Sequence, residues 1–153
     1  CFASVEGAPP SDELTESLRL DCPGVERMRN YYLYLWGLPM KLTDPGTQIA
    51  SEIEQATFDE RAALSAKVTY DAEVGSDIWY FYFDPATYQM IGYKFYHDEA
   101  AGDGEYILLR DEYDLLGMKI PAVRRWFTNR DSTFLGADHL VEDFQGQPAA
   151  DYR

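Results

Sequence analysis

The sequence predicts an α+β fold, in which a curved, half-barrel-like antiparallel meander of about six strands has N-terminal helical cover. Runs of alternating aromatic, aliphatic and polar residues follow one another between positions 77 and 130, with only tight turns between them. Such period-two runs are typical of consecutive antiparallel strands. A helical apolar stripe precedes them, and 12 Tyr, 8 Phe and 3 Trp suit strands with one apolar and one wet face.

Composition restricts the class of protein. The 153 residues are 46% hydrophobic, which is enough for one compact core, so we expect a single domain over 1–144 and a frayed tail over 145–153. The chain has 27 acidic and 13 basic residues and a net charge of −14. Such a charge repels phosphate backbones, so nucleic acid is not an expected partner. No run approaches the ~20 apolar residues of a membrane helix, so no transmembrane segment is expected.

Two helices are predicted, over about 12–20 and 24–37. Ser11 stands before Asp12 and Glu13, a pattern that suits an N-cap followed by an acidic first turn. The second helix carries one apolar stripe and ends at Gly37 and Pro39, and we expect its stripe to cover one face of the sheet. The stripe consists of Val25, Met28, Tyr32, Leu35 and Trp36.

The sheet is expected over about 62–142, after a predicted loop from Met40 to Asp59 that contains a Pro45-Gly46 turn. Alternation predicts that Ile91, Tyr93 and Phe95 share one face of their strand. The expected strands are 62–70, 78–83, 88–96, 106–115, 118–130 and 134–141.

Two cysteines leave three alternatives open. Cys1 could form a disulfide with Cys22, it could be the lipid-modified first residue of a mature bacterial lipoprotein, or both could be reduced thiols. A disulfide closing this loop would stabilise the fold by roughly 3 kcal/mol. The first two alternatives imply export.

The sequence offers little chemistry for catalysis, and no catalytic residue or cofactor is predicted. The acidic hairpin around His97 contains four weak candidates for a calcium site, but their spacing does not match an EF-hand loop, so a solvated hairpin is the preferred interpretation. They are Asp98, Glu99, Asp103 and Glu105. A hydrolase would need His97 and two carboxylates to converge in a pocket, and no Ser or Cys has a convincing nucleophile setting.

Three arginines stand out in an anionic chain. Arg110, Arg124 and Arg125 could pair across strands with the neighbouring Asp111, Glu112 and Asp114. Alternatively, Arg110 or Arg124 could point into the concave face and bind an acidic head group through a forked contact. The aromatic residues leave a similar choice, because they fill cores as well as contact ligands.

Several longer segments resemble a family of uncharacterised exported bacterial proteins. They lie at 31–42, 44–47, 79–85, 103–107, 120–121, 124–126 and 134–138. The resemblance implies a curved antiparallel sheet similar to lipoprotein-carrier half-barrels of the Lol type, which hold acyl chains on their concave face. It also implies sequence ahead of Cys1 in members of that family, and it supplies no catalytic residues.

We therefore expect a non-catalytic protein, exported to the periplasm or outer envelope, that binds a lipid-like or other hydrophobic ligand on the concave sheet face. A lipid anchor is an alternative form of attachment. The alternative function is a protein-interaction subunit of an envelope assembly, and a hydrolase is the third. The predicted ligand-binding residues are Trp79, Phe81, Tyr93, Phe95, Tyr96, Arg110, Arg124 and Trp126.

Overall fold

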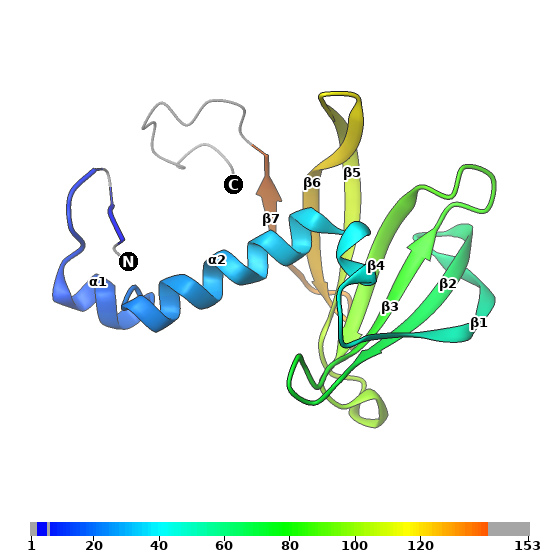
Figure 1. Ribbon diagram of the computed structural model, residues 1–153, viewed down its shortest axis with the longest axis horizontal. Helices are drawn as coiled ribbons and strands as arrows, with labels where there is room; N and C mark the ends of the chain where they lie inside the picture. The colour runs from blue at the N-terminus through cyan, green and yellow to red at the C-terminus, as the bar shows by residue number, and fades with distance from the viewer. Residues whose placement is uncertain (1–2, 6, 141–153) are drawn as a thin grey trace. The chain divides into compact units, whose positions relative to one another are not determined.

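The structure is a computed structural model that describes residues 3–5 and 7–140. Its elements fall into two compact units, a helical one through Lys41 and a sheet unit over Leu42–Leu140 (Figure 1). The predicted α+β class is confirmed, because helices precede an open antiparallel sheet. Cys1 and the tail 145–153 lie outside the described residues, and so does the predicted Cys1–Cys22 disulfide. The single domain over 1–144 and the helical cover of one sheet face stay predictions.

The helical unit contains α1 (Asp12–Ser17) and α2 (Cys22–Gly37). Ser11 caps α1 as predicted, since its Oγ accepts a hydrogen bond from the amide of Leu14 at 3.2 Å. The helix is shorter than expected, because Arg19 adopts a positive φ of 51°. Asp21 caps α2 by accepting from Gly24 N at 3.3 Å, which starts this helix two residues earlier than predicted. A 3-10 turn, η1 (Met40–Thr43), follows.

The sheet has seven strands that pair antiparallel in sequence order. Each strand therefore neighbours the strands that precede and follow it in the chain, as the predicted meander requires. A short 3-10 turn, η2 (Glu99–Ala101), lies in the β4–β5 connection. The strands are β1 (Thr47–Phe58), β2 (Arg61–Tyr70), β3 (Ile78–Phe83), β4 (Met90–Tyr96), β5 (Glu105–Leu115), β6 (Met118–Thr128) and β7 (Phe134–His139).

The predicted loop from Met40 to Asp59 is wrong, because η1 and the twelve-residue strand β1 occupy most of it. β1 forms one edge of the sheet, and nearly all of its side chains are exposed. Because β1 is an edge strand without a buried face, its sequence does not alternate between apolar and polar residues. The hydrophobic pattern therefore does not predict this strand. The pairing with β2 also shifts between Ile49 and Ile53, so a bulge interrupts the strand.

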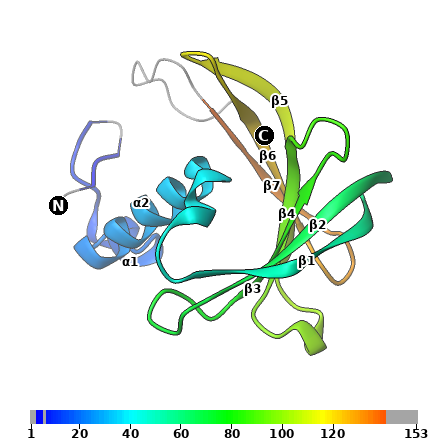
Figure 2. The same cartoon turned by 45° about the vertical axis from the view of Figure 1, so that its right-hand side comes forward.

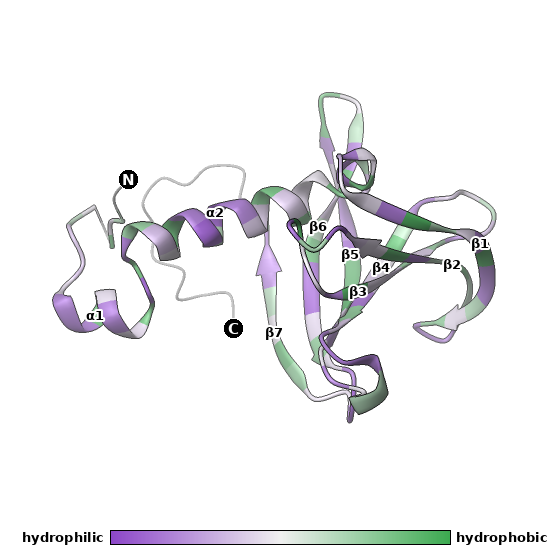
Figure 3. Cartoon of the chain, turned by 60° about the horizontal axis from the view of Figure 1, so that its bottom comes forward, coloured by the Kyte–Doolittle hydropathy of each residue, from purple (hydrophilic) through white to green (hydrophobic). Residues whose placement is uncertain are grey.

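The remaining strands present two aromatic faces. The first, here the Trp79 face, packs Trp79 and Phe81 of β3 against Tyr93 and Phe95 of β4, with ring centroids 4.9 to 5.9 Å apart. The second, here the Tyr106 face, contains a core cluster of Phe58, Ala63, Tyr82, Ile91 and Leu108. Figure 3 shows hydrophobic and hydrophilic residues interleaved along the strands. Ile91 lies on the Tyr106 face, and not with Tyr93 as predicted, because a bulge shifts the β3–β4 register beside it.

The β1–β2 hairpin folds over the Tyr106 face. The ring of Phe58 stacks on Tyr82 at 4.0 Å and meets Tyr106 edge-on at 6.3 Å, although these residues belong to β3 and β5. Asp59, in the hairpin turn, accepts a hydrogen bond from Arg110 of β5 at 2.6 Å. Strands two and four places apart in a flat sheet lie about 10 and 19 Å from each other, so these contacts require the strong bend and twist visible in Figure 2.

Gly92 of β4 lies beneath the β1–β2 hairpin, where Phe58 leaves no space for a side chain. A Cβ at this position would collide with the ring of Phe58 and would lie 2.5 Å from the carbonyl oxygen of Ile107.

We expect Gly92→Ala to lower the free energy of unfolding by about 1–3 kcal/mol, the usual effect of overpacking, as measured by urea denaturation. Gly75→Ala is the matched control, because its Cβ would meet only Tyr70 at 3.9 Å. Equal stability of the two variants would contradict the packing role of Gly92.

Candidate functional site

A row of aromatic and cationic side chains crosses six strands on the Tyr106 face. Each member is the register partner of the next, so all six lie at the same height on the sheet. Five inter-strand steps give the row a length of about 24 Å. None of its members is buried. This cation–aromatic row consists of Lys67, Tyr80, Lys94, Tyr106, Phe127 and Phe134.

The β5–β7 half of the row is apolar. Tyr106 stacks on Phe127 with ring centroids 5.0 Å apart and an interplanar angle of 9°, and Phe127 contacts Phe134 at 5.3 Å. The Arg125 guanidinium lies 5.5 and 5.4 Å from the centroids of Phe127 and Phe134. Phe134 is 51% exposed. Tyr106 and Phe127 are partly exposed, so the ring edges and the exposed part of Phe134 could accept an alkyl chain or a planar apolar group.

The β2–β4 half of the row is cationic. Lys94 Nζ lies between two rings, 5.8 Å from the centroid of Tyr82 and 5.9 Å from that of Tyr96. Lys67 Nζ contacts Glu99 at 3.0 Å and lies over the ring of Tyr80. Hydrogen bonds to Tyr80 and Glu99 raise the pKa of Lys67. Lys67 and Lys94 therefore differ in their ion pairing. Among the described residues, Lys67 has a carboxylate within ion-pair distance and Lys94 has none.

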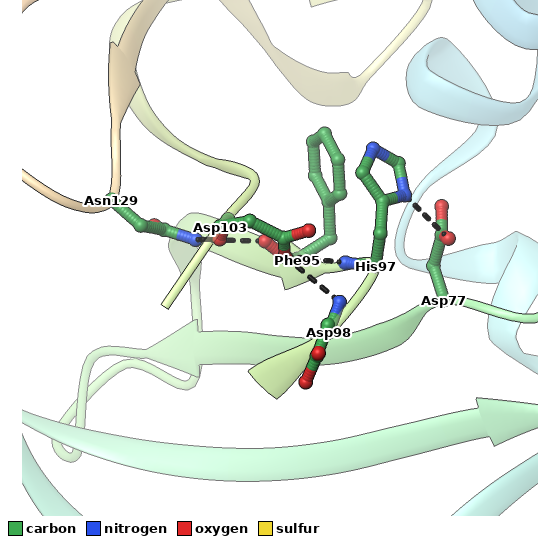
Figure 4. Close-up of polar contacts among 6 residues, drawn as sticks. All are labelled: Asp77, Phe95, His97, Asp98, Asp103 and Asn129. Atoms are coloured by element: carbon green, nitrogen blue, oxygen red, sulfur yellow. Dashed lines mark hydrogen bonds and ion pairs between the residues drawn. The ribbon is translucent and has the colours of Figure 1, made fainter. Parts of the chain in front are cut away.

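The acidic β4–β5 loop beside this row is held by its own carboxylates (Figure 4). Asp103 accepts hydrogen bonds from the amides of His97 and Asp98, each at 2.9 Å. Asn129, in the β6–β7 turn, donates from Nδ2 to the carbonyl oxygens of Phe95 at 2.8 Å and Asp103 at 2.7 Å. The loop is therefore fixed to the β6–β7 turn.

The four weak calcium candidates are engaged separately in this region. Asp98 caps η2 by accepting from the amides of Ala100 and Ala101, and Asp103 binds amides as described. Glu99 accepts from Tyr80 and Lys67, contacts that lower its pKa, whereas burial raises the pKa of Glu105. Within the range that the structure describes, no three His, Cys, Asp or Glu side chains are grouped to hold a metal ion.

His97 forms an exposed pair with Asp77. Its Nδ1 lies 2.8 Å from Asp77 Oδ1, and the imidazole is 63% exposed. The hydrogen bond that His97 donates to the Asp77 carboxylate is the main cause that raises the pKa of His97, and the charges of Asp103 and Glu105 add to it. The predicted hydrolase alternative requires His97 to lie in a pocket with two carboxylates, whereas this imidazole faces solvent beside Asp77.

The predicted ligand-binding residues divide between the two faces. Trp79, Phe81, Tyr93 and Phe95 form the Trp79 face and are buried. Arg124 and Trp126 of β6 share that face by register, since they pair with Leu109 and Ile107. Arg124 is fully buried, and Trp126 Nε1 donates to Asp138 at 2.8 Å.

Tyr96 and Arg110 lie on the Tyr106 face instead. Tyr96 contacts Tyr80 edge-on at 6.1 Å. The predicted pairing of Arg110 with carboxylates of its own hairpin is wrong, because the β1–β2 turn brings Asp59 to it. Sequence reasoning did not select Tyr106, Phe127 or Lys94 as site residues. These three residues could have been selected from the register of β4 to β6, but predicting that register requires each turn to be placed correctly.

Comparison with protein families matches residues 13–143 to DUF6503, which is described only as a family of unknown function. The chain belongs to this family. The match includes α2 and all seven strands, so it covers both units. No curated protein and no solved structure matched the chain. Among the helices that the structure describes, none is long and apolar enough to cross a membrane.

The His97–Asp77 pair predicts a pH dependence. Because the pKa of His97 is raised in the folded state, the pair stabilises the fold fully below the ordinary histidine pKa of 6.5. That contribution is lost as pH rises through the folded pKa. We expect Asp77→Asn to return the His97 pKa, followed by NMR, towards its ordinary value. Glu54→Gln, an equal charge change on exposed β1, should leave it unchanged. An unaltered titration in Asp77→Asn would contradict the pairing.

Proposed function

We propose that the protein is a non-catalytic cell-envelope protein that binds a lipid-like or other hydrophobic ligand on one face of its curved sheet. The cation–aromatic row of the Tyr106 face is the proposed binding surface. The observation that carries the proposal is a set of aromatic rings on three consecutive strands, of which Tyr106 and Phe127 are partly exposed and Phe134 is exposed. Accessible aromatic surface costs free energy in water, and a bound alkyl chain would recover part of it.

The Trp79 face supports ligand binding less well. Phe81 and Tyr93 are fully buried, and Trp79 and Phe95 are only 7% exposed. A ligand would have to displace the groups that now shield these rings, at the cost of lost packing. The Tyr106 face needs no such displacement, so binding there is compatible with the structure as it stands.

Export to the envelope is part of the proposal and is supported by the sequence resemblance described above. An open antiparallel meander is compatible with the half-barrel that the resemblance implies.

An interaction subunit of an envelope assembly is the second candidate. The observation that favours it is the β5–β6 hairpin tip, where Leu115, Leu116 and Met118 are exposed, Leu116 fully so. β5 pairs with β4 only over Glu105–Leu108, so this tip extends beyond the neighbouring strand. Strand addition at β1 is disfavoured, because its bulge and exposed Glu52 and Glu54 obstruct a new pairing partner.

The proposal predicts that Phe127→Ser weakens binding of decanol, an uncharged alkyl ligand, by about tenfold, as expected for losing one apolar contact surface. Isothermal titration calorimetry on the full chain measures the dissociation constant. Leu116→Ser is the matched control, since it removes an exposed apolar side chain away from the row. Native mass spectrometry of protein from its own source should also detect an alkyl-containing adduct that denaturation releases.

Two outcomes would overturn the proposal. A ligand-free monomer that also fails to bind decanol would exclude hydrophobic ligand binding. A defined complex with another protein, weakened by Leu116→Ser but not by Phe127→Ser, would favour the interaction subunit instead.

A further inference from the structure

We propose that the row selects an anionic amphiphile, a long-chain carboxylate, with its head group at Lys94 and its alkyl chain over Tyr106, Phe127 and Phe134. This inference rests on the proposed function and assigns the chemical class and orientation of its ligand. It is carried by three observations, namely the charge of Lys94, the pairing of Lys67, and the order of side chains along the row.

Lys94 provides the anion contact. The chain has 27 acidic residues, yet no described carboxylate lies within ion-pair distance of this ammonium group. Its neighbours are the rings of Tyr82 and Tyr96. An ammonium group has three donors, and the Tyr82 hydroxyl can use one of them. The remaining donors suit a carboxylate, for which a charge-assisted hydrogen bond is strong.

Lys67 is a poorer anion site. Glu99 already contacts it at 3.0 Å and also accepts a hydrogen bond from Tyr80. An incoming carboxylate at Lys67 would meet the negative charge of Glu99, because both would compete for the same ammonium group. The head group is therefore assigned to the centre of the row and not to its β2 end.

The alkyl chain is assigned by the order of residues after Lys94. Tyr106, Phe127 and Phe134 follow on β5, β6 and β7 without an acidic register partner between them. Three inter-strand steps separate Lys94 from Phe134, so the aromatic side chains extend to about 14 Å from the proposed head-group position. An ammonium group at one end and three consecutive aromatic side chains at the other match a linear anionic amphiphile lying across the strands.

The overall charge limits the ligand to a small number of negative charges. A net charge of −14 repels a polyanion at long range. At physiological salt, electrostatic interactions are screened over about 8 Å, so the interaction energy of a single bound carboxylate depends mainly on the charged groups nearest to it. A fatty-acid anion therefore fits the row better than a nucleic acid or an acidic polymer.

The test compares decanoate with decanol by isothermal titration calorimetry at neutral pH, using the full chain. Wild type should bind decanoate about tenfold more tightly than decanol, the expected effect of one charge-assisted hydrogen bond. Lys94→Gln should remove this preference, because it weakens decanoate binding much more than decanol binding, whereas Lys94→Arg should keep it. Urea denaturation of each variant verifies that folding is preserved.

Arg125→Gln is the matched control, because it removes another cation of the same face, whose guanidinium lies over the rings of Phe127 and Phe134. It should keep the preference for decanoate. Equal binding of decanoate and decanol by wild type, or a preference abolished by Arg125→Gln and not by Lys94→Gln, would overturn the inference while leaving the proposed function intact. Tight binding of decyl phosphate without decanoate binding would also overturn it. Failure of all three probes to bind would overturn the proposed function itself.

Discussion

The contact between the Phe58 ring and the bare backbone of Gly92 is the constraint on which the sheet's arrangement depends. It brings the β1–β2 hairpin over the Tyr106 face, where Tyr82 and Leu108 complete a small core. Without that hairpin the same face would be open along its whole width. Phe58 thus divides the face into a packed part and an accessible part, and the accessible part contains the aromatic rings available to a ligand.

Strand register determines which side chains meet on that accessible part. Six consecutive strands each contribute one residue to the cation–aromatic row, and every pair is fixed by the turn that joins its strands. A slip of one residue in any strand would send its side chain to the opposite face. The β4–β5 loop, held by Asp103 and Asn129, fixes the pairing of Lys94 with Tyr106. The hydrogen bonds of this loop therefore help to position the side chains of the proposed binding surface.

Sequence patterns predicted six strands well because each of them alternates or is apolar on both faces. They missed β1 because an exposed edge strand with a bulge has no periodic signal, and they placed Ile91 on the wrong face because a bulge reverses alternation. The aromatic residues of both faces were recognised, but the predicted site concentrated on the Trp79 face. Burial determines which face has side chains exposed for a ligand. It depends on the contacts that Phe58 and Asp59 make across several strands, and the pattern of a single strand does not predict such contacts.

Asn129 also has a consequence for motion. Its side chain and backbone amide together bind Phe95, Asp103 and Gly104, so the β6–β7 turn and the β4–β5 loop are joined by three hydrogen bonds. Opening either connection breaks these hydrogen bonds, so we expect the two connections to exchange their amides as one cooperative unit. Ordering of the loop beside Lys94 is then completed during folding, so little conformational entropy remains to be lost when the neighbouring surface is occupied.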